Sequence, residues 1–310
     1  MANVVGAARQ QDAENLAAPP RRDALLLAVA IAGVSFSGPL MAATVAPAFA
    51  IAFWRNAMGA GFAVSAVAVR RPRERIGARG WALAALAGVA LAVHFGTWVP
   101  SLTMTSVASA TALVCAQPIF AGLIALFLGR TLSRIAWTGI AVATLGTALI
   151  AGADLGVSVR ALAGDSLALA GGLAAAVYVT IGGAARARMS TAAYTAICYA
   201  TCAVLLLAAS VIGGVHLTGF SGNAWLKIAL VTVCAQLLGH TLINVALHTT
   251  SPTVVSLALL LETPGAALVA YVWLHQRPPL SAAPGLVLLL AGLVLVVRSR
   301  GRDIPVEATE

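Results

Sequence analysis

The stretch LAVHFGTWVPSLTMTSVASATALVCAQPIF, residues 91–120, recurs in outline 146 residues further along the chain. The offset pairs His94 with His240 and Pro118 with Pro264, without a gap. Other identical pairs are Gly139/Gly285, Gly146/Gly292, Ala112/Ala258 and Leu113/Leu259. Alanine and leucine are abundant here, but histidines and prolines inside apolar segments seldom coincide by chance. A duplicated membrane domain with polar groups in its interior is typical of secondary transporters.

The composition predicts an all-α integral membrane protein. The chain is 60% hydrophobic and 9% charged, whereas soluble domains average roughly 25% charged residues. The loops between apolar runs are too short for an appended catalytic domain, so we do not expect an enzyme. About 20 residues cross a bilayer as a helix, which predicts ten transmembrane helices at 24–45, 49–69, 81–101, 107–128, 135–152, 164–184, 192–212, 224–246, 253–273 and 281–298.

The distribution of basic residues predicts the orientation. With the N-terminus inside, fifteen arginines fall on the cytoplasmic side, and only Arg160, Lys227 and Arg277 fall outside. This bias predicts cytoplasmic N- and C-termini. The net charge of +9 is then explained by topology and by anionic lipid on the cytoplasmic side. No nucleic-acid partner is expected.

Five helices in each half is an odd number, so the two halves are expected to be inverted in the membrane. The predicted organisation is a disordered cytoplasmic tail (1–22), two five-helix repeats (24–152 and 164–298) and a C-terminal tail (299–310). The four cysteines all fall in predicted helices, where cysteine acts as a small apolar residue. We therefore expect no disulfide, no metal site and no cofactor.

Polar residues follow one another at four-residue intervals along predicted helix 224–246. On an α-helix this spacing forms one slowly drifting stripe, which must face protein or water because lipid would make it costly. The stripe either holds helices together through hydrogen bonds or lines a cavity. It consists of Thr232, Gln236, His240, Asn244 and His248.

A second polar face lies on predicted helix 81–101, where His94, Trp98 and Ser101 are spaced at i, i+4 and i+7. The repeat places His94 and His240 so that they approach the pseudo-symmetry axis from opposite halves. A buried histidine can also be a satisfied core residue. The Trp98 ring fits either a cavity wall or an interfacial anchor.

Glu262 is the one carboxylate predicted deep within a helix. An isolated ionised carboxylate is expensive there, so Glu262 either carries a proton that couples transport or hydrogen-bonds backbone freed by Pro264. Arg55 is interpreted as structural, snorkelling or pairing inside the bundle. Tyr178 needs a partner for its hydroxyl if it is buried. Gln117 is the polar residue beside Pro118.

The chain resembles the ten-helix EamA-type members of the drug/metabolite transporter superfamily. The likeness lies in AIAFWRNA (50–57), residues 91–120, GDSLALAGGLAAAVYV (164–179) and SPTVVSLALLLETPGAAL (251–268), and it covers roughly residues 24 to 298. It implies an inner-membrane carrier with a central cavity, and family activities that include export of amino acids and related metabolites. Residues at matching motif positions are His94, Trp98, Gln117, Tyr178, His240, Asn244 and Glu262.

The leading hypothesis is a carrier that exports a small metabolite, an amino acid or a relative, by alternating access. Gln236 joins the matching residues as a substrate contact, and Pro118 and Pro264 are candidate hinges. The alternative is proton-coupled efflux of drugs or organic cations, with Glu262 as the coupling carboxylate. A membrane-embedded enzyme and a channel are weaker alternatives. The choice between monomer and homodimer stays open.

Overall fold

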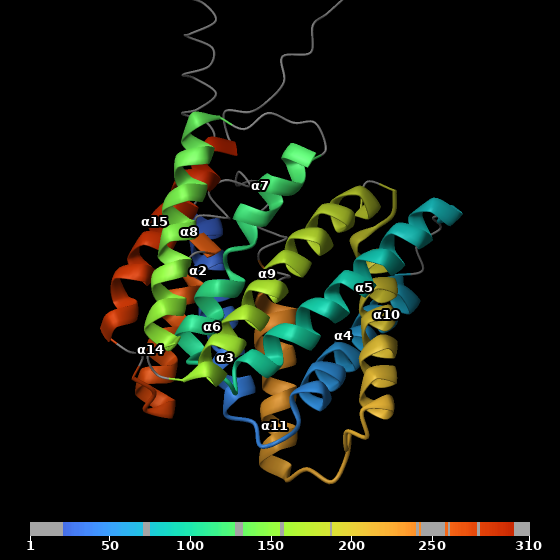
Figure 1. Cartoon of the computed structure of the whole chain (residues 1–310). Helices are drawn as coiled ribbons and strands as arrows, with labels where there is room; N and C mark the ends of the chain where they lie inside the picture. Colours follow the sequence, from blue (N-terminus) through green and yellow to red (C-terminus); the bar gives the residue numbers. More distant parts are fainter. Residues whose placement is uncertain are drawn as a thin grey trace, which may run out of the picture.

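The computed structural model describes residues 21–70, 75–127, 133–155, 158–186, 188–239, 242, 258–259, 261–277 and 280–300, and throughout these ranges the regular structure is helical. The helices are α2 (Arg21–Ser35), α3 (Ser37–Ala42), α4 (Ala48–Arg70), α5 (Ala78–Ser101), α6 (Val107–Val114), α7 (Gln117–Phe127), α8 (Arg134–Leu155), α9 (Val159–Arg186), α10 (Thr191–Ile212), α11 (Gly222–Val231), η1 (Thr232–Gly239), α14 (Glu262–Leu274), η2 (Leu280–Ala282) and α15 (Ala283–Arg300) (Figure 1).

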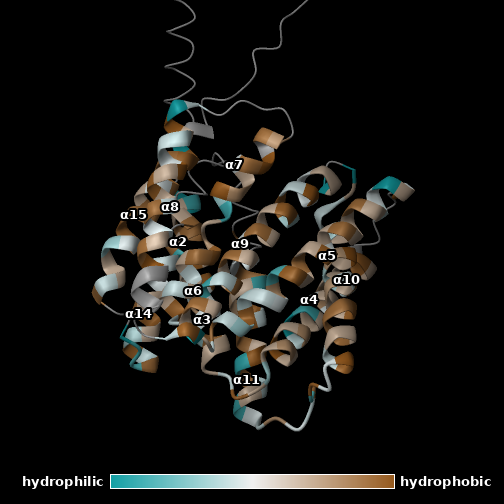
Figure 2. Cartoon of the chain, in the orientation of Figure 1, coloured by the Kyte–Doolittle hydropathy of each residue, from teal (hydrophilic) through white to brown (hydrophobic). Residues whose placement is uncertain are grey.

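The helices present apolar side chains outward, as expected in lipid. Seven helical stretches among the described residues are long and apolar enough to cross a membrane, and Arg134–Ile150 is a shorter apolar helix. Phe127 and Ile212 are 89% and 87% exposed, which water would disfavour. Figure 2 shows hydrophobic residues along the helices and hydrophilic ones at several helix ends. The chain is therefore a multi-pass membrane protein, and the count of ten spans stays a prediction.

Two of the predicted spans are broken rather than continuous. Span 24–45 divides into α2 and α3, and span 107–128 divides into α6 and α7. Helix α2 ends at Ser35 and helix α6 ends at Val114, which are the residues four positions before Pro39 and Pro118. Proline has no N–H to donate to the carbonyl at i−4 and its ring clashes with that carbonyl. The break in each span therefore follows from the sequence.

The helix predicted at 224–246 changes type within the span. Gly222–Val231 is α-helical, but Thr232–Gly239 is a π-helix, with its hydrogen bonds spaced i→i+5. Four residues make slightly less than one turn of a π-helix, so Thr232 and Gln236 still lie near one face, although the stripe was predicted for an α-helix. Thr232 and Gln236 are both buried. His240, Asn244 and His248, the rest of the stripe, lie outside the described residues.

Helices from the two halves of the chain pack directly against each other. Helix α8 lies along α15, α4 along α10, and α6 against α14, and Figure 1 shows α8 and α15 together at one side of the bundle. The 146-residue repeat relates α8 to α15 and α4 to α10, whereas the counterpart of α14 in the first half is α7.

The contact between α8 and α15 is built on glycines. A Cβ on Gly139 would lie 2.8 Å from the Gly292 carbonyl oxygen, and one on Gly146 would lie 2.7 Å from that of Gly285. Lower-numbered residues of α8 thus face higher-numbered residues of α15, so the two helices cross antiparallel. Small residues allow such close backbone approach in membranes.

Candidate functional site

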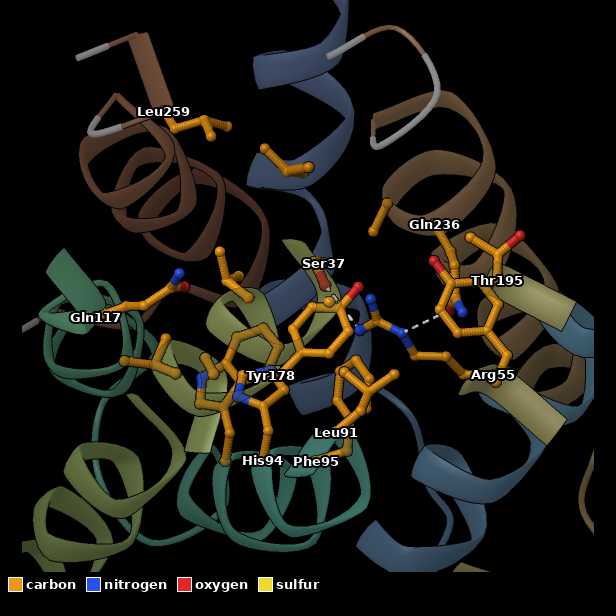
Figure 3. A pocket seen from close by; sticks show the side chains of 18 of the residues that line it. Ser37, Arg55, Leu91, His94, Phe95, Gln117, Tyr178, Thr195, Gln236 and Leu259 are labelled. Atoms are coloured by element: carbon orange, nitrogen blue, oxygen red, sulfur yellow. Dashed lines mark hydrogen bonds between the residues drawn. The ribbon is translucent and has the colours of Figure 1, made fainter. Parts of the chain in front are cut away.

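A cavity of about 430 Å³ lies among helices from both halves of the chain. Its wall includes six residues that the sequence predicted to contact substrate or couple transport, namely His94, Trp98, Gln117, Tyr178, Gln236 and Glu262. Substrate-sized cavities of roughly 300–1,000 Å³ are typical of small-molecule sites. Figure 3 shows several of these side chains directed into a common space.

Arg55, on α4, reaches into this cavity and is only 3% exposed. Its Nε donates to Gln236 Oε1 at 3.2 Å, and its Nη1 donates to Ser37 Oγ at 3.2 Å. Nη1 also approaches Met41 Sδ at 3.6 Å. The guanidinium carbon lies 4.3 Å from the centre of the Phe95 ring, within the range of a cation–π interaction. Arg55 thus joins α4 to the π-helix and to α3.

The break between α2 and α3 positions Ser37, one of the hydrogen-bond partners of Arg55. Because α2 ends at Ser35, α3 restarts at Ser37 with its buried hydroxyl beside Arg55. On the π-helix, Gln236 fits beside Gly59, where a Cβ would lie 2.6 Å from the Gln236 amide nitrogen. The Tyr199 hydroxyl interacts with the same Gln236 side chain.

Three rings of α5 form one wall of the cavity. His94 and Trp98 stack with centroids 5.5 Å apart, and the Phe95 and Trp98 centroids lie 6.4 Å apart. Nδ1 of His94 lies 2.9 Å from the Gly171 carbonyl oxygen on α9. A Cβ on Gly171 would lie 3.1 Å from Trp98 Cβ, so glycine allows α9 to approach this aromatic wall closely.

Trp98 has an unused hydrogen-bond donor. The side chain is 4% exposed, and within the described chain its buried Nε1 has no hydrogen-bond partner. Buried indole N–H groups are normally satisfied. The orphan donor on a cavity wall therefore marks a place where a ligand acceptor or water would be favourable.

Several cavity residues were not predicted from the sequence. They include Ser37, Phe95, Cys115, Tyr194, Thr195 and Tyr199. Tyr194 and Tyr199 on α10 are 3% and 8% exposed, and in an apolar span they resemble packing residues. Tyr178 and Tyr194 interact through their hydroxyls. The hydroxyls give this apolar wall several hydrogen-bonding groups.

Glu262 is the first residue of α14 and borders the cavity. Among described residues, its carboxylate has no hydrogen-bond or ion-pair partner, although it interacts electrostatically with Arg55. Pro264 lies in the first turn of α14, and the carbonyl group that it leaves without a donor is that of Leu260, which lies outside the described residues. That Glu262 satisfies backbone freed by Pro264 therefore stays a prediction.

Helices start at equivalent places in the two halves. Helix α7 starts at Gln117 and helix α14 starts at Glu262, one position apart in the 146-residue repeat. Pro118 and Pro264, the predicted hinges, fall in these first turns. Discontinuous helices at a repeat interface are where secondary transporters place their substrate sites.

The comparisons with known proteins bear directly on this arrangement. The sequence model of the EamA-like transporter family matches residues 24–152 and 162–298, one match for each half. The chain belongs to the EamA-like transporter family. Two matched segments make it a two-repeat EamA-like protein, and membership indicates a membrane transporter of small molecules.

A solved structure shares the fold of this chain. This structure, titled only as the crystal structure of a protein, matches with a TM-score of 0.62 at 17% sequence identity, covering 89% of this chain and 96% of that one. At this identity the likeness shows the fold alone. The comparison with curated proteins found no match. The substrate therefore has to be argued from the cavity.

Proposed function

We infer that this protein is a secondary transporter of the inner membrane that exports an amino acid or a related small metabolite by alternating access. The observation that carries the proposal is the cavity beside the starts of α7 and α14, with Arg55, Glu262 and several aromatic rings in its wall. An amino acid offers a carboxylate, an ammonium group and an apolar or aromatic body. Each of these groups has a complement in the wall.

The inverted arrangement of the two halves is part of this proposal. The antiparallel crossing of α8 and α15 supports it, because inversion turns equivalent helices to run in opposite directions. With both termini cytoplasmic, the connection between α9 and α10 lies on the inner side, where Arg186 and Arg188 satisfy the positive-inside rule. Arg186 and Thr191 are exposed and border the cavity. We therefore assign this conformation as open toward the cytoplasm.

Contacts between the halves close the opposite end. Trp54 Nε1 donates to the Leu217 carbonyl oxygen at 2.6 Å. Lys227 Nζ donates to the Ala43 carbonyl oxygen, the C-cap of α3, at 2.9 Å. Opening to the outside requires these hydrogen bonds to break while others form near Arg186.

A second candidate function is proton-coupled efflux of organic cations. The observation that favours it is Glu262, a carboxylate without a described ion-pair partner in a cavity rich in aromatic rings. Rings and a carboxylate together bind lipophilic cations. Arg55 argues against this candidate, because its positive charge in the same cavity repels a cation.

The experiment that tests the proposal is counterflow with purified full-length protein in proteoliposomes. Vesicles are preloaded with amino acids, amines or nucleosides, and uptake of the labelled compound is followed with and without a pH gradient. We expect saturable exchange of at least one amino acid, because a carrier with bound substrate reorients across the membrane in both directions. Protein-free vesicles are the control.

The other outcomes separate the alternatives. Exchange confined to lipophilic cations would establish the efflux function in place of amino-acid export. Flux that rises linearly with concentration and shows no exchange would indicate a channel. Absence of amino-acid exchange from protein shown to be folded would refute the assignment to amino acids. His240→Ala and Asn244→Ala, each expected to cut exchange without loss of folded protein, test the predicted contacts outside the described residues.

A further inference from the structure

Arg55 is a buried cation whose hydrogen-bond partners are all neutral. The described contacts are the Gln236 amide oxygen, the Ser37 hydroxyl, the Met41 sulfur and the face of Phe95. A charge within a membrane protein is costly unless an opposite charge or several strong hydrogen bonds compensate it. Both oxygen contacts are 3.2 Å long, whereas charge-assisted hydrogen bonds to an anion are about 2.7–2.9 Å.

Among the described residues, no anionic group is in direct contact with the Arg55 guanidinium. Glu262 is near enough to interact with Arg55 electrostatically, but no ion pair joins the two among the described residues. Only Nε and Nη1 of Arg55 make hydrogen bonds with described groups, and the side chain borders the cavity. Figure 3 shows the guanidinium directed toward the space that Tyr178 also enters.

A second donor lies near the same ring. The centroid of Phe95 is 4.3 Å from the Arg55 guanidinium carbon and 6.4 Å from the Trp98 centroid. Trp98 Nε1 is the orphan donor described above. One cavity therefore offers, near the apolar ring of Phe95, a positive charge without an ion pair and an N–H group without a hydrogen-bond partner among the described residues.

We propose that Arg55 binds the carboxylate of the transported molecule, while the rings of Phe95 and Trp98 contact its apolar or aromatic body. Nη2 is free to donate to a carboxylate oxygen, and the Nε and Nη1 contacts hold the guanidinium plane in place. Arg55 thereby selects for an anionic group, which a lipophilic cation lacks. The inference rests on the proposed transport function and narrows its substrate class to carboxylates.

The first test compares two compounds of the same shape on the wild-type protein. At mildly acidic pH, L-phenylalanine and L-phenylalaninamide share the ring and the ammonium group, but only phenylalanine has a carboxylate. Each is used at increasing concentration to inhibit counterflow of labelled L-phenylalanine. We expect phenylalanine to inhibit at a concentration at least about tenfold lower, because an ionic hydrogen bond is lost with the amide.

Equal inhibition by the two compounds would overturn the role of Arg55 and leave the transport function standing. If other amino acids exchange but phenylalanine does not, the amino acid that exchanges best is compared with its amide. The expected difference in inhibiting concentration is again about tenfold. Failure of every amino acid to exchange would remove the proposed function and, with it, this inference. The wild-type comparison needs no variant and does not depend on how a substitution affects folding.

Variants then assign the effect to the residue. Arg55→Gln should abolish the preference for phenylalanine over its amide, and Arg55→Lys should retain part of it because the charge remains. Arg134→Gln, at an exposed position at the start of α8, is the matched control and should keep the full preference. Arg55→Gln protein that folds and still prefers phenylalanine tenfold would overturn the proposal.

Discussion

Replacing Gly146 with leucine is expected to remove most of the folded protein from the membrane. A side chain there meets backbone atoms of α15, including the Gly285 carbonyl oxygen 2.7 Å from a Cβ. Backbone cannot swing aside as a flexible side chain can. Overpacking in a well-packed core commonly costs about 1–3 kcal/mol or more, and here the overlap involves two main chains along one interface.

Gly61 provides the control, because leucine can be added there without meeting a neighbouring helix. Gly61 on α4 is exposed, and a Cβ there meets nothing within 4 Å. We expect Gly61→Leu to express and elute like the wild type in fluorescence-detected size-exclusion chromatography. Gly146→Leu should lose roughly tenfold or more of the monodisperse peak, since about 1.4 kcal/mol is a factor of ten in population. Equal peaks for the two variants would contradict the described α8–α15 contact.

Replacing Glu262 with glutamine is expected to abolish the response of transport to a proton gradient while exchange continues. This expectation assumes that a proton and the ammonium group of the substrate occupy the Glu262 carboxylate alternately, so that the two move in opposite directions. A gradient of one pH unit supplies about 1.4 kcal/mol per proton, equivalent to a tenfold concentration ratio. Glutamine keeps the size of the side chain but has no proton to exchange.

The measurement is accumulation of labelled substrate in proteoliposomes with and without a gradient of one pH unit. Wild-type protein should concentrate the substrate up to about tenfold, and Glu262→Gln should only equilibrate it. Glu262→Asp retains a carboxylate and should keep part of the response. If Glu262→Gln concentrated the substrate as well as the wild type, the coupling role would be wrong. Loss of folded protein in that variant alone would favour the structural role.

The sequence predicted the helical architecture because its strongest signals are local. Apolar runs define membrane helices, and the paired histidines and prolines reveal the repeat without any structural information. The breaks after Ser35 and Val114 were also predictable, since each lies four residues before a proline. The π-helix at Thr232–Gly239 was not, because its i→i+5 bonds have no residue signature in this stretch.

The candidate site was only partly predictable for a similar reason. His94, Trp98 and Gln236 stood out as polar or amphipathic groups in apolar helices. Arg55 was assigned a structural role because its position near a helix end allowed snorkelling. Its place on the cavity depends on Ser37 and Phe95, which belong to other helices. Tyr194 and Tyr199 were missed because only their hydroxyls are polar, and tertiary packing decides where these point.

The central claim is that the two ends of the cavity open alternately, and a distance across the closed end tests it most directly. Spin labels are placed at exposed positions in the two halves, Val45 and Gly222, and the distance distribution is recorded by pulsed electron spin resonance in nanodiscs. Trp54→Phe removes the hydrogen bond to Leu217 and keeps a ring. Losing such a bond costs about 0.5–1.5 kcal/mol, a shift of roughly twofold to tenfold in the conformational equilibrium.

Trp81→Phe, at a 52% exposed tryptophan on α5, is the matched control. We expect Trp54→Phe to enlarge the population with the longer distance between the spin labels. Trp81→Phe should leave the distance distribution of the spin-labelled protein without either substitution unchanged. Addition of the amino acid that exchanges should shift the balance between the two populations. One distance, unchanged by Trp54→Phe and by the amino acid, would contradict alternating access.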